Sequence, residues 1–153
     1  MSFNSFEEII RFAIGKEEEA VAFYENAGRK EPYSGARQLF SDFAEEERKH
    51  VALLSRYLDG EKKVEDYQFE WIPDLKRSNY VVDLNFEEGM AYPDLLRLAM
   101  KREEASLRLY NDLQKKAEKK EVVKVFKMLS QEEAKHKLAL ETLYDDYMAS
   151  QGD

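Results

Sequence analysis

Two stretches of the chain repeat one pattern of glutamate and histidine: Phe40–His50, FSDFAEEERKH, and Phe126–His136, FKMLSQEEAKH. Each stretch ends in Glu-x-x-His, formed by Glu47 and His50 in the first and by Glu133 and His136 in the second. The 153 residues contain only these two histidines, and they lie 86 residues apart, as the two glutamates do. The pattern is therefore better explained by an internal repeat than by chance.

A second pair of stretches repeats with the same offset. Ala13–Tyr24 reads AIGKEEEAVAFY and Ala99–Tyr110 reads AMKREEASLRLY, which aligns Glu17 with Glu103. The repeated unit is too long for a solenoid repeat and is the right size for a pair of helices. The sequence thus predicts one duplicated two-helix unit.

The predicted helices cover about residues 5–30, 34–60, 92–119 and 121–147. Ser5 and Glu8 form a capping-box pattern at the first helix, and Pro93 suits the first turn of the third. The segment of about 61–91 is too long for a hairpin turn, so we expect a crossover, with a short extra helix at Asn85–Glu88. Two hairpins joined by one long crossover form an all-α, ferritin-like four-helix bundle, here a single domain over residues 1–153.

A polar residue interrupts the apolar stripe of every predicted helix. Residues spaced three and four apart share one helix face. On that face Glu17 and Glu103 have no histidine one turn later, whereas Glu47 and Glu133 are each followed by one. The neighbouring glutamates leave the stripe and are expected in solvent; they are Glu18, Glu19, Glu45, Glu46, Glu104 and Glu132.

Four glutamates inside one core need a compensating charge. A buried carboxylate costs several kcal/mol unless it is paired or binds a cation. Two divalent ions would balance the four carboxylates and leave two neutral imidazoles as further ligands. One Glu from each of two helices and Glu-x-x-His from the other two is the ligand pattern known from di-iron carboxylate bundles. We therefore expect two iron ions, with manganese or zinc as alternatives, held by six residues: Glu17, Glu47, His50, Glu103, Glu133 and His136.

Two tyrosines lie on the same stripes, two turns beyond the single glutamates. The hydroxyls of Tyr24 and Tyr110 would orient a carboxylate ligand or supply an electron near the metal, or the rings simply pack in the core. The residues alone leave both readings open.

Composition excludes several other classes. The net charge of -8 argues against nucleic acid as a partner, and the absence of cysteine rules out disulfides, iron–sulfur clusters and iron held by four cysteines within this chain. Residues 1–11 show no secretory signal, and no apolar run is long enough to span a membrane. We expect a cytoplasmic protein.

The quoted motifs resemble those of the rubrerythrin family of ferritin-like proteins, over about residues 6–147. The characteristic runs are Glu-x2-Ala-x2-Phe-Tyr at Glu17–Tyr24 and Glu-Glu-Glu-x2-His at Glu45–His50. The resemblance implies a non-haem di-iron site on the six residues named above and an oxidoreductase that reduces hydrogen peroxide or reacts with O2. Family habit and the duplication suggest a homodimer.

The sequence departs from the family in two ways. Full-length rubrerythrins carry a rubredoxin domain, which a chain without cysteine lacks, so electrons are expected from a separate donor such as a rubredoxin. Typical members also have a glutamate one turn after the third-helix ligand, where this chain has Ser106. This change removes the family's ligand-switch residue and implies a more symmetric site, as in ferroxidase-type bundles.

Three functions consequently stay open. The first is a di-iron reductase of peroxide or O2, the second is a ferroxidase that handles iron, and the third is a non-catalytic metal-stabilised helical module. Fold analogy alone does not choose between them.

Overall fold

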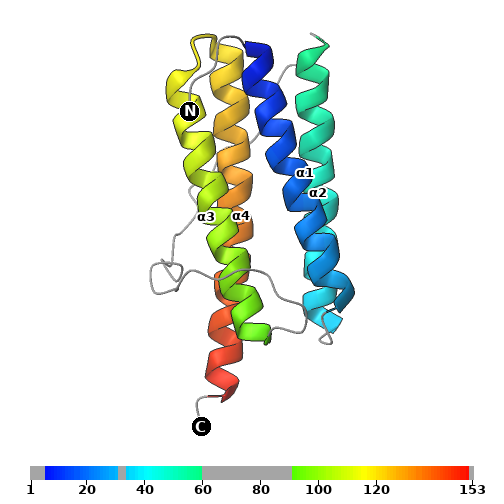
Figure 1. Cartoon of the computed structure of the whole chain (residues 1–153). Coiled ribbons are helices and arrows are strands. Elements are labelled where there is room, and N and C mark those ends of the chain that lie inside the picture. Colours follow the sequence, from blue (N-terminus) through cyan, green and yellow to red (C-terminus); the bar gives the residue numbers. More distant parts are fainter. Residues whose placement is uncertain (1–5, 31–33, 60–90, 152–153) are drawn as a thin grey trace. The chain divides into compact units, whose positions relative to one another are not determined.

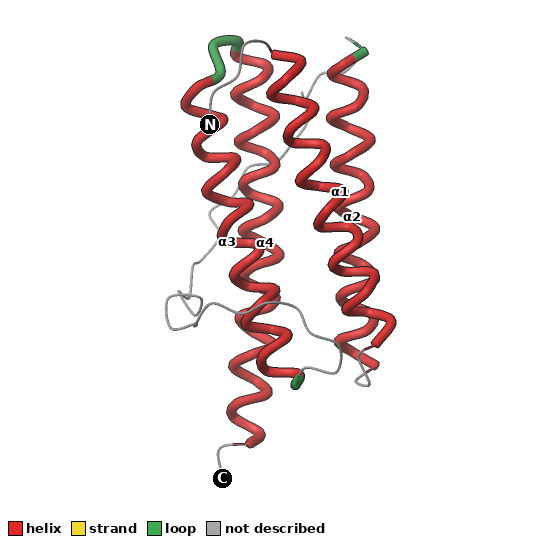
Figure 2. Tube along the Cα trace, viewed as in Figure 1, coloured by secondary structure: helices red, strands yellow, loops and turns green. Residues whose placement is uncertain are grey.

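Four helices make up nearly all of the described chain. The computed structural model describes residues 6–30, 34–59 and 91–151, and within these ranges it contains no β-strand. The helices are α1, Phe6–Lys30; α2, Ser34–Leu58; α3, Tyr92–Lys116; and α4, Lys120–Gln151 (Figures 1 and 2). The predicted cap at Ser5, the short helix at Asn85–Glu88 and all of the predicted crossover of about residues 61–91 except Ala91 lie outside the described residues.

The chain divides into two compact units, Met1–Glu65 and Asp66–Asp153. In the first, α1 packs along α2; in the second, α3 packs along α4 (Figure 2). Each unit is thus a helical hairpin, as the repeat predicts. The expectation that both belong to one domain stays a prediction.

The core of the first hairpin follows the predicted stripes. Ile10 and Ala13 of α1 and Phe40 and Leu54 of α2 are fully buried. Tyr24 is buried as well, and its ring stacks on that of Phe40 with centroids 5.9 Å apart and an angle of 20°. Burying apolar side chains on one face of each helix is the main force that holds such a hairpin together.

The second hairpin repeats this packing. Tyr110 stacks on Phe126 with centroids 6.1 Å apart and an angle of 22°. These are the residues that the repeat aligns with Tyr24 and Phe40, so the duplication extends from the sequence to the geometry of the core.

The ends of α3 and α4 differ from the predicted ones. α3 stops at Lys116, where Ala117 takes an extended conformation with ψ 135° and its N–H bonds to the carbonyl of Leu113. The sequence predicts this end near residue 119, because a run of lysine and glutamate without glycine or proline offers no clear stop signal. α4 begins at Lys120 and continues to Gln151, four residues beyond the predicted end.

A buried ion pair lies on α4. The ammonium of Lys137 lies 3.2 Å from Oε2 of Glu141, with side chains only 4% and 0% exposed. Among the described residues, no helix is both long enough and apolar enough to cross a bilayer.

Candidate metal centre

The first hairpin brings two carboxylates and one imidazole together in its core. α1 supplies Glu17 and α2 supplies Glu47 and His50, and all three are nearly inaccessible, with exposures of 2%, 1% and 6%. Nδ1 of His50 lies 3.5 Å from Oε2 of Glu17 and 3.5 Å from Oε1 of Glu47. Glu47 and His50 share a helix face because they are three residues apart, and Glu17 meets them across the hairpin.

The helical register decides which glutamates enter this core. Glu18 and Glu19 on α1 and Glu45 and Glu46 on α2 are exposed, although they adjoin the buried residues in sequence. Glu104 of α3 and Glu132 of α4, also expected in solvent, are half-buried. One step along a helix turns a side chain by about 100°. The stripe therefore selects the same member of each glutamate run that the sequence predicted.

The second hairpin builds the same cluster. Glu103 of α3 and Glu133 and His136 of α4 are 2%, 1% and 4% exposed. Nδ1 of His136 lies 3.5 Å from Oε1 of Glu103 and 3.7 Å from Oε2 of Glu133. Five of the six side chains are at most 4% exposed, and His50 reaches 6%.

The spacing of the ligand atoms suits a metal ion. Within each cluster, one ligand atom per residue can be chosen so that all lie within 4.8 Å of one another. The 3.5–3.7 Å contacts are longer than a charge-assisted hydrogen bond of about 2.7–2.9 Å. They are close to the distance of about 3.0–3.4 Å between neighbouring ligands placed around an ion at about 2.1 Å.

The charge of each cluster also suits a metal ion. Two carboxylates carry a formal charge of −2 in a place that water barely reaches, and one divalent cation would neutralise it. Carboxylate oxygen together with imidazole nitrogen is a donor set that suits iron, manganese and zinc. The residues present therefore fit one divalent ion in each hairpin.

The two tyrosines of the stripes lie in the aromatic layer of each hairpin. Tyr24 and Tyr110 are both 1% exposed, and Tyr24 also packs edge-on against Phe43 with centroids 5.2 Å apart. This packing accounts for their burial, and a role beside the metal stays a prediction. Ser106, at the position of the family's extra glutamate, is half-buried.

Sequence reasoning missed the buried pair of Lys137 and Glu141. A lysine and a glutamate four residues apart usually mark the solvent face of a helix. The first hairpin has Val51 and Ser55 at the equivalent positions, so the repeat offered no ionic pair to compare. No signal in the sequence distinguishes this pair from an exposed one.

An all-α chain made of two hairpins, each with a buried carboxylate–imidazole cluster, belongs to the class of ferritin-like helical proteins with sites suited to metal. The model of the rubrerythrin family matches residues 8–144, and the chain belongs to that family. This match confirms both the predicted fold class and the family resemblance of the sequence.

One solved structure is similar over most of its length. It is a hypothetical protein from Pyrococcus furiosus that is 28% identical, with a TM-score of 0.68, and the similarity covers 92% of this chain and 89% of the other. No curated protein matches the chain.

Proposed function

We propose that the protein is a non-haem di-iron oxidoreductase that reduces hydrogen peroxide with electrons from a separate carrier. One observation carries this proposal: the same buried set of two carboxylates and one imidazole occurs in both hairpins, with His-to-Glu contacts of 3.5–3.7 Å. Membership of the rubrerythrin family supports it. The proposal assigns one iron ion to each cluster.

The protein residues hold the ions and set their charge. In the first hairpin, Glu17 and Glu47 would together neutralise one Fe(II). In the second, Glu103 and Glu133 would neutralise another. The neutral imidazoles would bind through Nδ1, the nitrogen that faces the carboxylates. When bound, two ferrous ions can together supply the two electrons that cleavage of an O–O bond requires.

The overall reaction balances with an external source of electrons. Hydrogen peroxide takes up two electrons and two protons and gives two molecules of water. The 153 residues contain no cysteine and so cannot hold a thiolate-bound iron of their own. The electrons would therefore come from a separate one-electron carrier, which must deliver twice per turnover.

Rapid mixing tests this function. Protein loaded with two ferrous ions per chain under nitrogen is mixed with hydrogen peroxide or with O2, and iron oxidation is followed by absorbance. We expect one peroxide to oxidise two ferrous ions, faster than O2 does at equal concentration. A reaction without preference for peroxide, or one that no carrier protein can reverse, would count against the proposal.

A matched variant makes the test specific. Glu47→Ala removes a buried carboxylate, whereas Glu46→Ala removes an exposed one from the adjacent position. The first should lose the fast reaction with peroxide and the second should keep it.

Iron oxidation is the second candidate, and Ser106 favours it. Without a glutamate at this position the two clusters have equivalent ligand sets, which is the arrangement expected of a ferroxidase. Added Fe(II) and O2 distinguish the two functions. A ferroxidase oxidises many ferrous ions per chain, whereas a peroxide reductase stops after oxidising the two ferrous ions that it binds. Storage would also require a hollow shell of many subunits rather than the expected homodimer, and sedimentation analysis measures that difference.

A further inference from the structure

A hollow between α1 and α2 lies at the level of the first metal cluster. It has a volume of about 410 Å³, and its lining includes Ile14 and Val21 of α1 and Val51 of α2. Ile14 precedes Glu17 by three residues and Val21 follows it by four, which are rises of about 4.5 and 6 Å along α1. Val51 directly follows His50 on α2. Both helices therefore place neighbours of their cluster residues on the wall of this hollow.

The wall beside the cluster is apolar and only partly buried. Val21 and Val51 are half-buried, and His50, at 6%, is the most accessible of the six cluster residues. Small side chains at a protein surface change conformation within picoseconds to nanoseconds, which opens brief gaps between them. A charged, hydrated ion pays a large desolvation cost in such a gap, whereas a small uncharged molecule does not. A path here would therefore favour an uncharged molecule over a metal ion.

The second hairpin fills the equivalent place. The repeat aligns three residues of the lining with residues that have longer side chains: Ile14 with Met100, Val51 with Lys137, and Ser55 with Glu141. The three residues of the first hairpin are half-buried, whereas their equivalents are at most 3% exposed. Lys137 and Glu141 are also held together at 3.2 Å. The two clusters have matching ligands, but the helix seam beside the first one is less tightly filled.

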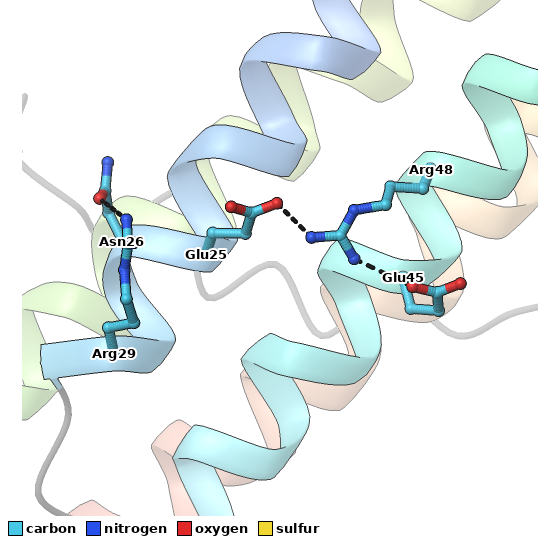
Figure 3. Close-up of polar contacts among 5 residues, drawn as sticks. All are labelled: Glu25, Asn26, Arg29, Glu45 and Arg48. Atoms are coloured by element: carbon cyan, nitrogen blue, oxygen red, sulfur yellow. Dashed lines mark hydrogen bonds and ion pairs between the residues drawn. The ribbon is translucent and has the colours of Figure 1, made fainter.

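A charged pair bounds the apolar hollow. Arg48 of α2 donates to Glu25 of α1 and, at 2.9 Å, to Glu45 of its own helix (Figure 3). The hydrogen bonds to Glu25 and Glu45 raise the pKa of the Arg48 guanidinium above its usual value. Arg48 and Glu25 also line a further hollow between the same helices, which includes Gly28 and Ala44. The pair thus marks the boundary between the two hollows and leaves the apolar wall beside the cluster uncharged.

We propose that hydrogen peroxide reaches the iron of the first hairpin from the apolar hollow, by passing between Val21 and Val51. The proposal rests on the proposed function, which makes peroxide the oxidant. The two valines determine specificity: they admit a molecule close to water in size and hold back larger peroxides. Neither side chain takes part in the chemistry.

Access to the cluster can be measured without turnover. Protein loaded with Mn(II) instead of iron accelerates the relaxation of bulk water protons to the extent that water reaches the ions, and water resembles hydrogen peroxide in size and polarity. The double variant Val51→Lys with Ser55→Glu introduces the ion pair of the second hairpin and keeps the net charge. We expect it to bind the same amount of manganese and to lose most of the relaxation enhancement.

Oxidation kinetics gives the second test. Ala22 and Ser55 line the hollow, so Ala22→Leu with Ser55→Leu fills it without adding charge. This variant and the charged one should each slow oxidation of the ferrous protein by hydrogen peroxide roughly tenfold. Ala52 is exposed on the same helix face region but does not line the hollow, so Ala52→Leu should react at the wild-type rate.

A widened hollow should change the choice of peroxide. Val51→Ala removes two methyl groups from the wall and should raise the rate with tert-butyl hydroperoxide relative to hydrogen peroxide. Val123→Ala makes the same change at a half-buried position of α4 and should leave that ratio unchanged. A gain of reactivity is not produced by a variant that merely folds badly.

The outcomes separate this proposal from the proposed function. If peroxide oxidises the wild type and both filled variants at one rate, or if water relaxation is the same in all three, the path is wrong and the function stands. A wild type that does not react with peroxide overturns both. A change of oligomeric state in the filled variants would also overturn the path, since a second copy of the chain would then cover the hollow.

Discussion

Nδ1 of His50 lies 3.5 Å from Oε2 of Glu17, across the interface of α1 and α2. His136 and Glu103 repeat this relationship at 3.5 Å across the interface of α3 and α4. A single contact between a histidine and a carboxylate is common in proteins. Here the contact occurs twice, each time with a further carboxylate one turn away on the histidine's own helix. Structural packing alone therefore explains these buried clusters poorly.

The first prediction concerns the number of bound ions. Glu47→Ala removes one of three ligands from the first cluster and should reduce bound iron from two ions per chain to one, because the second cluster keeps its full set. Glu133→Ala should do the same from the other hairpin. The measurement is metal content by mass spectrometry after removal of free iron, and Glu46→Ala, at an exposed site, should still bind two.

The second prediction concerns stability with and without metal. Glu17→Gln keeps the shape of the side chain but removes a buried negative charge, so the metal-free variant should be more stable than the metal-free wild type by about 1 kcal/mol. Ferrous iron at about 100 times its dissociation constant should stabilise the wild type by about 2.7 kcal/mol at each site. Urea unfolding under nitrogen measures both effects.

The variant should gain less from iron than the wild type does, since one of its sites has lost a ligand. A metal-free Glu17→Gln that is less stable than the wild type would show that the carboxylate is needed for packing rather than for a cation.

The third prediction concerns the buried ion pair of α4. Lys137→Met would leave Glu141, 0% exposed, without its ammonium partner at 3.2 Å and should destabilise the metal-free protein by about 3–5 kcal/mol. The double variant Lys137→Val with Glu141→Ser introduces the residues of the first hairpin and should recover part of that loss. Urea unfolding of the double variant and of its two single variants, Lys137→Val and Glu141→Ser, gives the coupling between the two side chains.

The exposed pair of Arg11 and Glu7 provides the control. Its side chains are 65% and 63% exposed, so Arg11→Met should change stability little. Equal losses from Lys137→Met and Arg11→Met would mean that burial of the α4 pair has no energetic consequence.

The fourth prediction concerns glycine inside α1. Gly15 is exposed and helical, and a Cβ added to it would meet nothing within 4 Å. Gly15→Ala should therefore stabilise the protein by about 1 kcal/mol, through the lower backbone entropy of alanine in the unfolded chain. Thermal unfolding measures this, and no increase in the midpoint would contradict the expectation.

The sequence predicted the inward-facing residues well, because helix geometry is regular. Glu17 and Glu47 lie within runs of three glutamates, yet the spacing of the apolar residues around them singled out the member that is buried. The apolar stripe of α4 likewise predicted correctly that Glu133 is buried. A period of 3.6 residues accumulates little error over two or three turns, so a few apolar neighbours fix the register.

Other features depend on contacts that a periodic pattern does not contain. The end of α3 at Lys116 depends on the conformation of Ala117, and neither residue type signals a stop. The burial of Lys137 depends on what packs around α4. A hollow between α1 and α2, lined by Gly28 and Ala44 among others, depends on several residues together, none of which signals a cavity in the sequence.

The iron content and visible spectrum of the protein, loaded with ferrous iron under nitrogen and then exposed to hydrogen peroxide, decide whether the two clusters form a redox-active di-iron site. We predict two iron ions per chain, colourless when ferrous, with absorbance in the near-ultraviolet and visible range appearing as one peroxide is consumed per two ions. Protein that binds zinc alone, or that binds iron without any spectral change on addition of peroxide, would contradict it.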